Sequence, residues 1–231
     1  MIKPSVLVGF AVSLSAVLVG LCVYAGQRVN DVEGCILNRL TDEAQEIRES
    51  AGASCVGLSK QAVPILLQAI RDKRIIGMVN CKDEGCSYGW EAADALSKIG
   101  RPAVSGLVDA LRDSDPAVRA QAATALGNIA PNEPMNVAPL GSALRDSDSW
   151  VRISAANALG KRGSAAKSAV RALTETLNDT SPKVRTWAAI ALGDIGATAK
   201  SALPTLRRAL QDDDGNVRDA AASAIEKILE Q

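Results

Sequence analysis

The sequence of 231 residues contains no histidine and few aromatic side chains: three tryptophans, two tyrosines and one phenylalanine. Without histidine, neither a Ser-His-Asp or Cys-His catalytic arrangement nor a histidine-ligated metal centre can be built. A glycine-rich phosphate-binding loop is also missing. The sequence therefore predicts no catalytic, metal-ligating or cofactor-binding residues, and we expect a protein that is not an enzyme and needs no cofactor.

An excess of charge of either sign is missing as well, because 26 lysines and arginines balance 26 aspartates and glutamates. The repeated part of the chain shows no basic stripe and no aromatics interleaved with basic residues. Affinity for nucleic acid rests chiefly on the neutralisation of phosphates. The sequence therefore argues against nucleic acid as a partner.

What the sequence does contain is a 33-residue internal repeat marked by a Val-Arg pair. An aspartate stands five residues before each valine, a leucine two residues before that aspartate, and a leucine or isoleucine eight residues after the valine. The four pairs are Val118-Arg119, Val151-Arg152, Val184-Arg185 and Val217-Arg218. Because these four aligned positions recur at the same 33-residue spacing in all four units, they indicate a stack of structural repeats.

Each unit is predicted to contain two helices. One begins after a capping residue that directly precedes a proline, as in Asp115-Pro116 and Ser181-Pro182. A proline at the first helical position loses no hydrogen bond there. The residues expected on the buried face of the first such helix are Val118, Ala122, Ala125, Leu126 and Ile129. The residues expected to lie away from that face are Gln121, Thr124 and Asn128.

A glycine is expected to end each of these helices, at Gly127, Gly160 and Gly193, with Gly100 and Gly196 a little later in their own units. The helix that follows carries apolar residues at positions 137, 140 and 144, at 170, 173 and 177, and at 203, 206 and 210. We expect the helix from Val217 to Glu230 to be the last of a complete chain, because Asp219, Ser223, Glu226 and Lys227 give it a polar outer side that suits a terminal cap.

This pattern resembles the HEAT repeat family, and within it the alanine-rich bacterial subtype first described in phycobilisome lyases. The residues that carry the resemblance run from Leu111 to Gly127 as Leu-Arg-Asp-x-Asp-Pro-x-Val-Arg-x-x-Ala-Ala-x-Ala-Leu-Gly, and recur with small departures in three more units. The resemblance implies an all-α fold, a right-handed α-α superhelix or HEAT-repeat solenoid, with the Val-Arg helices lining its concave face. One N-terminal hydrophobic helix would precede the solenoid.

Three regions follow from this interpretation. Residues 1–27 form a membrane anchor or signal segment, residues 28–59 a helical region that contains cysteine, and residues 60–231 the HEAT-like solenoid.

The resemblance further implies a ladder in which the aspartate and the arginine of neighbouring units pair. Its members would be Asp113 and Arg119, Asp146 and Arg152, Asp179 and Arg185, and Asp212 and Arg218. A carboxylate at a helix entrance is favoured by the helix dipole, and a partly buried arginine needs an acceptor. We therefore expect these residues to be structural.

The first residues of the chain form an apolar segment. No charge occurs from Pro4 to Gln27, and Ser5 to Tyr24 is about as long as the ~20 residues that a membrane-spanning helix needs. Lys3 precedes it and Arg28 follows it, which favours a cytoplasmic N-terminus with the repeats on the extracytoplasmic side of the membrane. A cleaved signal peptide, with a site near Val23-Tyr24-Ala25 and a secreted product, is the alternative.

Four of the five cysteines lie between this segment and the regular repeats: Cys35, Cys55, Cys81 and Cys86. An even number in an exported chain favours disulfides. Pairing Cys81 with Cys86 and Cys35 with Cys55 would close short local loops. Free thiols are the alternative, and a metal site is disfavoured because Cys-x-x-Cys spacing and histidine are both missing.

The tryptophans, Trp90, Trp150 and Trp187, lie in or next to the Val-Arg helices. By repeat register, Trp150 and Trp187 fall in columns whose other members are mostly polar, which suggests that they face solvent. Ile153 and Ile190 also fall in columns that elsewhere hold polar residues or alanine. An apolar group of Trp150, Ile153, Trp187 and Ile190 would suit a protein partner. The alternative is that these rings pack between units.

The sequence therefore predicts a non-catalytic protein–protein interaction scaffold, membrane-tethered or exported, that binds another protein on the concave face. Two other functions stay open. One is a bilin lyase or chromophore-handling protein of the phycobilisome-lyase type, which only the resemblance suggests. The other is a structural spacer of the cell envelope.

Overall fold

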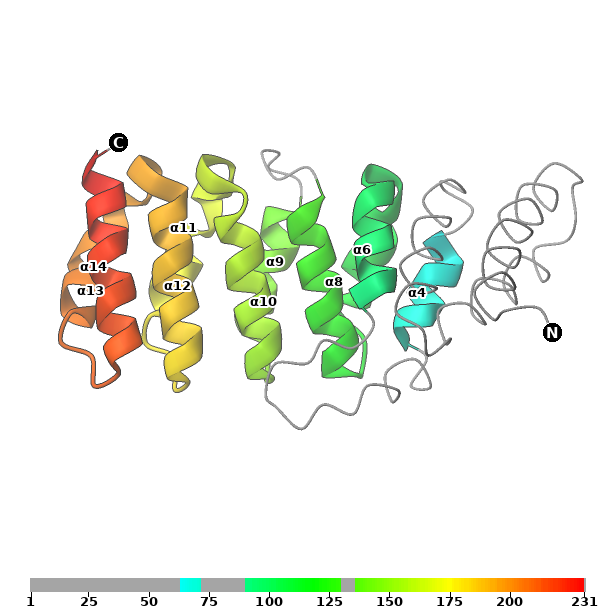
Figure 1. The fold of residues 1–231 in the computed structure, drawn as a ribbon, viewed down its shortest axis with the longest axis horizontal. Helices are drawn as coiled ribbons and strands as arrows, with labels where there is room; N and C mark the ends of the chain where they lie inside the picture. The colour runs from blue at the N-terminus through cyan, green and yellow to red at the C-terminus, as the bar shows by residue number, and fades with distance from the viewer. Residues whose placement is uncertain (1–62, 72–89, 130–135, 231) are drawn as a thin grey trace, which may run out of the picture. The chain divides into compact units, whose positions relative to one another are not determined.

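The computed structural model describes residues 63–71, 90–129 and 136–230, and every regular element in these ranges is a helix (Figure 1). The chain divides into two compact units, residues 1–103 and 104–231. In the first unit, α4 (Val63–Arg71) packs against α6 (Trp90–Ile99), and the 3-10 turn η2 (Arg101–Ala103) follows. Leu66, Ile70 and Leu96 are buried there.

The second unit consists of alternating short and long helices. Its elements are α7 (Val104–Ala110), α8 (Pro116–Asn128), α9 (Val137–Ala143), α10 (Ser149–Gly160), η3 (Gly163–Ala169), α11 (Val170–Thr176), α12 (Pro182–Ile195), η4 (Gly196–Ala202), α13 (Leu203–Ala209) and α14 (Gly215–Glu230). The long helices α8, α10, α12 and α14 pack side by side in chain order and form one layer. The short helices α7, α9, α11 and α13 each pack against the long helix that follows them and form the other layer.

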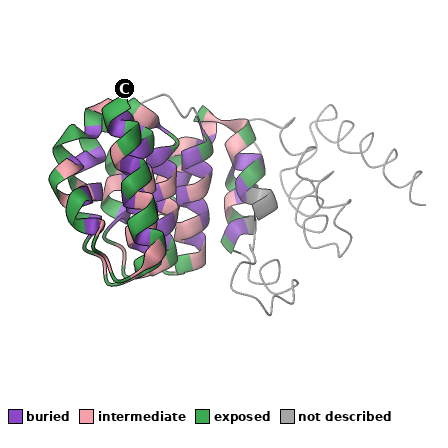
Figure 2. Cartoon of the chain, turned by 60° about the vertical axis from the view of Figure 1, so that its left-hand side comes forward, coloured by how far each residue is buried: buried purple, intermediate pink, exposed green. Residues whose placement is uncertain are grey.

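The core lies between these two layers. Each long helix buries the valine of its Val-Arg pair together with several alanines, so that neighbouring helices approach closely. Figure 2 shows buried residues between the helices and exposed residues on their outer sides. The buried face predicted for α8 is confirmed, since Val118, Ala122, Ala125, Leu126 and Ile129 are all buried.

Gln121 departs from the prediction that it lies away from this face, because it is only 8% exposed. The reason is that α8 contacts both α7 and α10. A helix with neighbours on two sides has a wider buried surface than a single apolar stripe indicates.

The prediction that a glycine ends each of these helices is confirmed for Gly160, the last residue of α10, but is wrong for Gly127 and Gly193, after which α8 and α12 continue to Asn128 and Ile195. All three glycines are buried. A Cβ atom at Gly127 would lie 2.7 Å from the Cβ of Ala158, and equivalent contacts follow one repeat later. These glycines therefore mark the points where neighbouring long helices touch.

The helix ends themselves follow the expected chemistry in part. Asp115 Oδ1 accepts the backbone N–H of Ala117 (2.9 Å), as predicted for an N-cap. Ser181, in the same repeat column, makes no side-chain capping bond, so that prediction is wrong. The backbone N–H of Ser181 donates to Asp179 Oδ1 (2.8 Å), as that of Asp115 does to Asp113 Oδ1 (3.1 Å). After α12, Gly196 has a φ of 71°, a left-handed value that glycine adopts without strain.

Several predictions concern residues outside the described ranges. These are the apolar segment Ser5 to Tyr24, the region 28–59 and the cysteines Cys35, Cys55, Cys81 and Cys86. Among the residues that are described, no helix is both long enough and apolar enough to span a bilayer. The membrane segment, the disulfides and the hand of the superhelix stay predictions.

Candidate functional site

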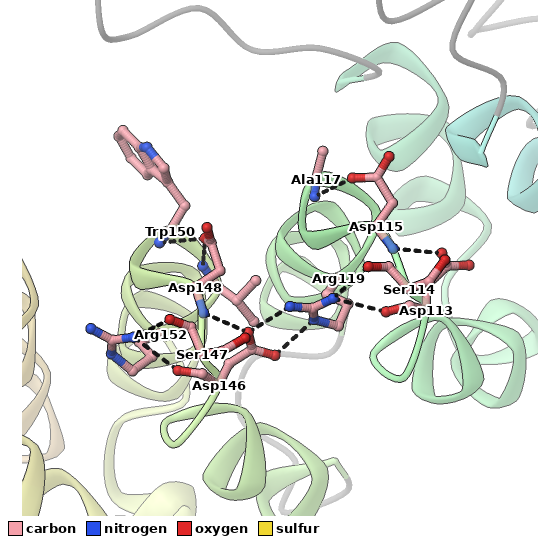
Figure 3. A network of polar contacts seen from close by, with 11 residues as sticks. Asp113, Ser114, Asp115, Ala117, Arg119, Asp146, Ser147, Asp148, Trp150 and Arg152 are labelled. Atoms are coloured by element: carbon pink, nitrogen blue, oxygen red, sulfur yellow. Dashed lines mark hydrogen bonds and ion pairs between the residues drawn. The ribbon is translucent and has the colours of Figure 1, made fainter.

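An arginine–aspartate ladder runs along one edge of the long-helix layer (Figure 3). Arg119 donates from Nε to Asp146 Oδ2 (2.7 Å) and from Nη2 to Asp146 Oδ1 (2.7 Å). The same two-bond arrangement joins Arg152 to Asp179 and Arg185 to Asp212. Such bidentate pairs fix geometry as well as charge. Each rung therefore connects one repeat to the next.

The aspartate of the arginine's own unit takes part through its backbone. Arg119 Nη1 donates to the carbonyl oxygen of Asp113 (2.9 Å), and Arg152 Nη1 donates to that of Asp146 (2.8 Å). Arg185 and Arg218 bond in the same way to the carbonyl oxygens of Asp179 and Asp212. The pairs named from the sequence thus meet through carbonyl groups, whereas the carboxylates on Arg119, Arg152 and Arg185 belong to the following unit.

Two of the ladder carboxylates, Asp146 and Asp212, have pKa values below the ordinary range, which favours their ionised form. The side chains of the three ion pairs are only 12–15% exposed. Burial raises the pKa of Asp146, but hydrogen bonds from Arg119 and from the backbone N–H of Asp148 outweigh burial and bring the pKa below its ordinary value. The hydrogen bond from Arg185 likewise lowers the pKa of Asp212. These groups are engaged in structure and are not poised to transfer protons.

A second set of contacts lies at the other end of the long helices. Lys161 Nζ donates to Asn128 Oδ1 (2.7 Å), and Lys227 Nζ donates to Asp194 Oδ1 (2.7 Å). The partners are 33 residues apart, so the repeat spacing itself was the signal that could have identified them.

Arg162 is a buried residue that the sequence did not single out. It is fully buried, and its Nη2 donates to the carbonyl oxygens of Leu126 and Ile129. Leu126 lies in the last turn of α8, where carbonyl groups run out of regular intrahelical donors, and Ile129 directly follows the helix. The equivalent positions of the other repeats hold Ile129, Ile195 and Ile228, so an arginine among isoleucines was the available signal.

The four residues predicted to bind a partner differ in exposure. Trp150, near the start of α10, is 51% exposed. Trp187 and Ile190, on α12, are half-buried. Ile153 is only 7% exposed, so the prediction that it belongs to the partner-binding surface does not hold for its side chain. Trp90 begins α6 in the first unit, and its side chain lies outside the described set.

The backbone of Trp150 is fixed by the helix cap. Asp148 Oδ1 accepts the backbone N–H groups of Trp150 (2.8 Å) and Val151 (3.2 Å). Figure 3 shows the indole ring pointing away from the ladder. Among the described residues, the large hydrophobic side chains that are exposed are Trp150 and Leu229, and Leu229 lies near the end of α14. Trp150 is therefore an isolated aromatic group on a rigid support.

The charge distribution corrects one expectation from the sequence. The exposed side of the short-helix layer is basic along η3, α11, η4 and α13, so the repeats do carry a basic surface. The balance of charge over the chain hid it, because acidic residues such as Asp212, Asp213 and Asp214 lie in a loop instead. No group of three or more described acidic or cysteine side chains is arranged to hold a metal ion.

Two layers of alternating helices, joined by a repeated ladder, define the second unit as an α-solenoid of tandem repeats. The sequence profile of HEAT repeats matches residues 104–175 and 137–226, which together make up more than half of the chain. The chain belongs to the HEAT repeat family.

Solved structures of repeat proteins are similar in fold. Importin beta matches with a TM-score of 0.62 and 18% identity, covering 86% of this chain and 32% of importin beta. The CpcE–CpcF complex of phycocyanin lyase from Nostoc sp. PCC7120 matches with a TM-score of 0.56 and 22% identity, covering 71% of this chain and 98% of that one. A designed armadillo repeat protein in complex with the peptide (KR)4 matches with a TM-score of 0.51 and 20% identity, covering 84% and 98%. No curated protein matches the sequence significantly.

Proposed function

We propose that this protein is a non-catalytic scaffold that binds another protein through the layer of α8, α10, α12 and α14. The observation that carries the proposal is the exposure of Trp150. Aromatic side chains dominate the energetics of protein interfaces. The cap from Asp148 already orders the backbone at Trp150, so little conformational entropy is lost when a partner covers the ring.

The neighbouring helix provides the rest of the surface. Trp187 and Ile190 are half-buried on α12, the helix next to α10, and would flank the anchor, while Ile153 supports it from within the layer. We place this layer on the concave face of a right-handed superhelix. The fold supports such a role, since one similar structure is a designed repeat protein in complex with a peptide and another is a complex of two chains.

The proposal also includes attachment to the membrane through the apolar segment Ser5 to Tyr24, with the repeats on the extracytoplasmic side. Its support is the length of the segment and the flanking Lys3. Release after signal cleavage is the alternative form of the same export.

A second candidate function has one observation in its favour, the similarity to the phycocyanin lyase structure. A chromophore-handling protein would co-purify with a bilin and absorb visible light. A colourless protein after expression with bilin present would argue against this alternative.

Site-specific photocrosslinking tests the scaffold. A photoreactive phenylalanine analogue is placed at position 150 of the full chain in its native cells, and at position 229 as a control, because Leu229 is an equally exposed apolar residue (57%). We expect one discrete protein adduct from position 150 and not from position 229. If both positions crosslink to the same mixture of many proteins, the result would contradict the proposal of a specific binding surface and would favour a structural spacer.

A further inference from the structure

Positive charge is concentrated on the exposed side of the short-helix layer in its last two repeats. Segments 163–176 and 196–209 contain five basic residues and a single carboxylate, that of Glu175. All six side chains belong to exposed residues. The five basic residues, called the basic face below, are Lys167, Arg171, Lys200, Arg207 and Arg208.

These residues form one surface, because the elements that carry them are neighbours. η3 packs beside η4, and η4 also contacts α11 and α13. Lys167 and Lys200 occupy equivalent positions in η3 and η4, one repeat apart. The basic face therefore extends across two repeats and does not converge on one point, which suits an extended anionic surface better than a small anion.

Little of this charge is neutralised within the protein. Glu175 Oε2 accepts a hydrogen bond from Arg145 Nη2 (2.6 Å), and its Oε1 accepts one from Arg171 Nε (3.2 Å), so this carboxylate is already engaged. Lys167, Lys200, Arg207 and Arg208 form no ion pair within the part of the chain that the structure describes. In the opposite layer, in contrast, Arg119, Arg152 and Arg185 each hold a carboxylate.

The surroundings distinguish between anionic partners. Proteins that bind single-stranded nucleic acid combine a basic groove with aromatic side chains on which bases stack. The basic face contains no aromatic residue, and Trp150 lies on the opposite layer of helices. A membrane surface rich in anionic lipid needs only basic side chains that reach its headgroups.

We propose that the basic face docks the repeats on the anionic headgroups of the membrane to which the chain is attached. This inference rests on the membrane attachment in the proposed function. Five basic residues bind a free domain to a membrane weakly, but an attached domain has a high effective concentration at the surface. Docking through the short-helix layer leaves the layer with Trp150 facing away from the lipid, where a partner can reach it.

Lysine reactivity of the full chain in liposomes tests the docking. The protein is inserted into vesicles of phosphatidylcholine alone or with about one third phosphatidylglycerol, acylated briefly with a water-soluble reagent, and mapped by mass spectrometry. We expect anionic lipid to lower the reactivity of Lys167 and Lys200 by about threefold or more, because a docked face is shielded most of the time. Lys161, Lys183 and Lys227, outside the basic face, serve as internal controls and should not change.

Two further experiments decide whether electrostatic docking causes the lowered reactivity of Lys167 and Lys200. Raising the salt from about 0.1 M to 1 M shortens the Debye length from ~10 to ~3 Å and should restore the reactivity of both lysines. In the triple variant K200Q/R207Q/R208Q, anionic vesicles should no longer lower the reactivity of Lys167. In the variant K161Q/K183Q/K227Q, which loses the same charge on other surfaces, they should still lower it.

Three results would overturn the proposal. The first is equal reactivity of Lys167 and Lys200 in neutral and anionic vesicles. The second is protection by an added single-stranded oligonucleotide but not by anionic vesicles, which would assign the face to nucleic acid. The third is failure of the chain to float with neutral vesicles, which would remove the membrane attachment. Adducts at position 150 report on the partner separately.

Discussion

Three glycines set the distance between neighbouring long helices. A Cβ atom would lie 2.7 Å from Ala158 Cβ at Gly127, 3.1 Å from Ala191 Cα at Gly160, and 2.9 Å from Ala224 Cα at Gly193. At Gly127 and Gly193 these distances are shorter than real Cβ atoms show, and at Gly160 the neighbour would have to move by a few tenths of an ångström in a packed interior. Gly127 and Gly193 are therefore required by the contact with the next repeat and not by their own backbone angles.

The variant G127A tests this contact. Alanine is the better helix former by about 1 kcal/mol, yet we expect G127A to lower the free energy of unfolding by about 1–3 kcal/mol, because the added methyl group overpacks α8 against α10. The measurement is denaturant unfolding of the full chain. Adding A158G should restore only part of the loss, since the backbone Cα of Ala158 would still lie 2.8 Å from the new methyl.

Gly141 provides the matched control. It lies inside α9, and a Cβ atom there would meet no heavy atom within 4 Å. G141A should therefore leave stability unchanged or raise it by up to about 1 kcal/mol. Equal effects of G127A and G141A would show that the glycine contact does not set the helix spacing.

The ladder carboxylates predict how stability depends on pH. Hydrogen bonding to Arg119 holds the pKa of Asp146 below its ordinary value in spite of burial. A carboxyl whose pKa is lower in the folded state stabilises the fold above its unfolded pKa of about 3.9, and this contribution disappears as the pH falls through the folded value. The free energy of unfolding should thus be level above about pH 5 and decrease below about pH 4.

The variant D146N should be less stable at neutral pH and should lose less stability between pH 7 and pH 3. D219N, which removes an exposed carboxylate of α14 outside the ladder, is the control and should follow the wild type. A D146N curve parallel to that of the wild type would contradict the assignment of acid sensitivity to the ladder.

At the scale of the helix, the long helices owe their stability to burial between repeats. Leu159 of α10 is fully buried, as are the equivalent Leu126 and Leu192. We expect L159A to lower the free energy of unfolding by about 2–5 kcal/mol, because a truncated core leucine leaves a cavity. L229A, at an exposed leucine of α14, should change it by no more than about 0.5 kcal/mol. A thermal midpoint of L159A equal to that of the wild type would disprove the assigned core face.

The helices of the repeats were largely predictable, because the same spacing of apolar residues recurs in four units that are 33 residues apart. Val118, Leu126 and Ile129 are buried where periodicity placed them. The roles of the glycines were not predictable, since a glycine that ends a helix and a glycine that contacts the next helix look the same within one repeat. The direction of the ladder was hidden for the same reason, because the spacing within a unit does not show that Arg119 reaches forward to Asp146.

The surface was harder to predict than the core. Comparison with the equivalent positions of the other repeats correctly predicted that Trp150 faces solvent. The same comparison predicted exposure for Ile153, which is buried. Exposure of a side chain depends on the size of its neighbours on the adjacent helices, and a column of aligned residues does not contain that information. The basic face was not predicted, because its charge is balanced over the chain by acidic residues elsewhere, such as Asp212, Asp213 and Asp214 in a loop.

At the scale of the whole molecule, the second unit has two surfaces of different chemistry. The long-helix layer carries the exposed Trp150 and a ladder with three bidentate ion pairs, and the short-helix layer carries the basic face. A protein attached to a membrane can use one surface to orient itself and the other to bind a partner. The proposal that the repeats lie on the extracytoplasmic side of the membrane can be tested separately.

Labelling of intact cells with a membrane-impermeant thiol reagent tests that location. If the repeats are exported and Cys35, Cys55, Cys81 and Cys86 form disulfides, these cysteines should be labelled only after reduction. Labelling that requires broken cells, whether or not a reductant is added, would place the repeats in the cytoplasm and favour the chromophore-handling alternative. Cys22, inside the apolar segment, should stay unlabelled in intact cells in either case.

The most direct test of the scaffold is the affinity of the protein that crosslinks at position 150, measured by calorimetry with wild type, W150A and L229A. Trp150 is an exposed anchor, so W150A should melt like the wild type but bind the partner about 30-fold or more weakly, as expected for an interface hot spot. L229A should bind with unchanged affinity. Wild-type affinity of W150A would contradict the central claim that Trp150 anchors a protein partner.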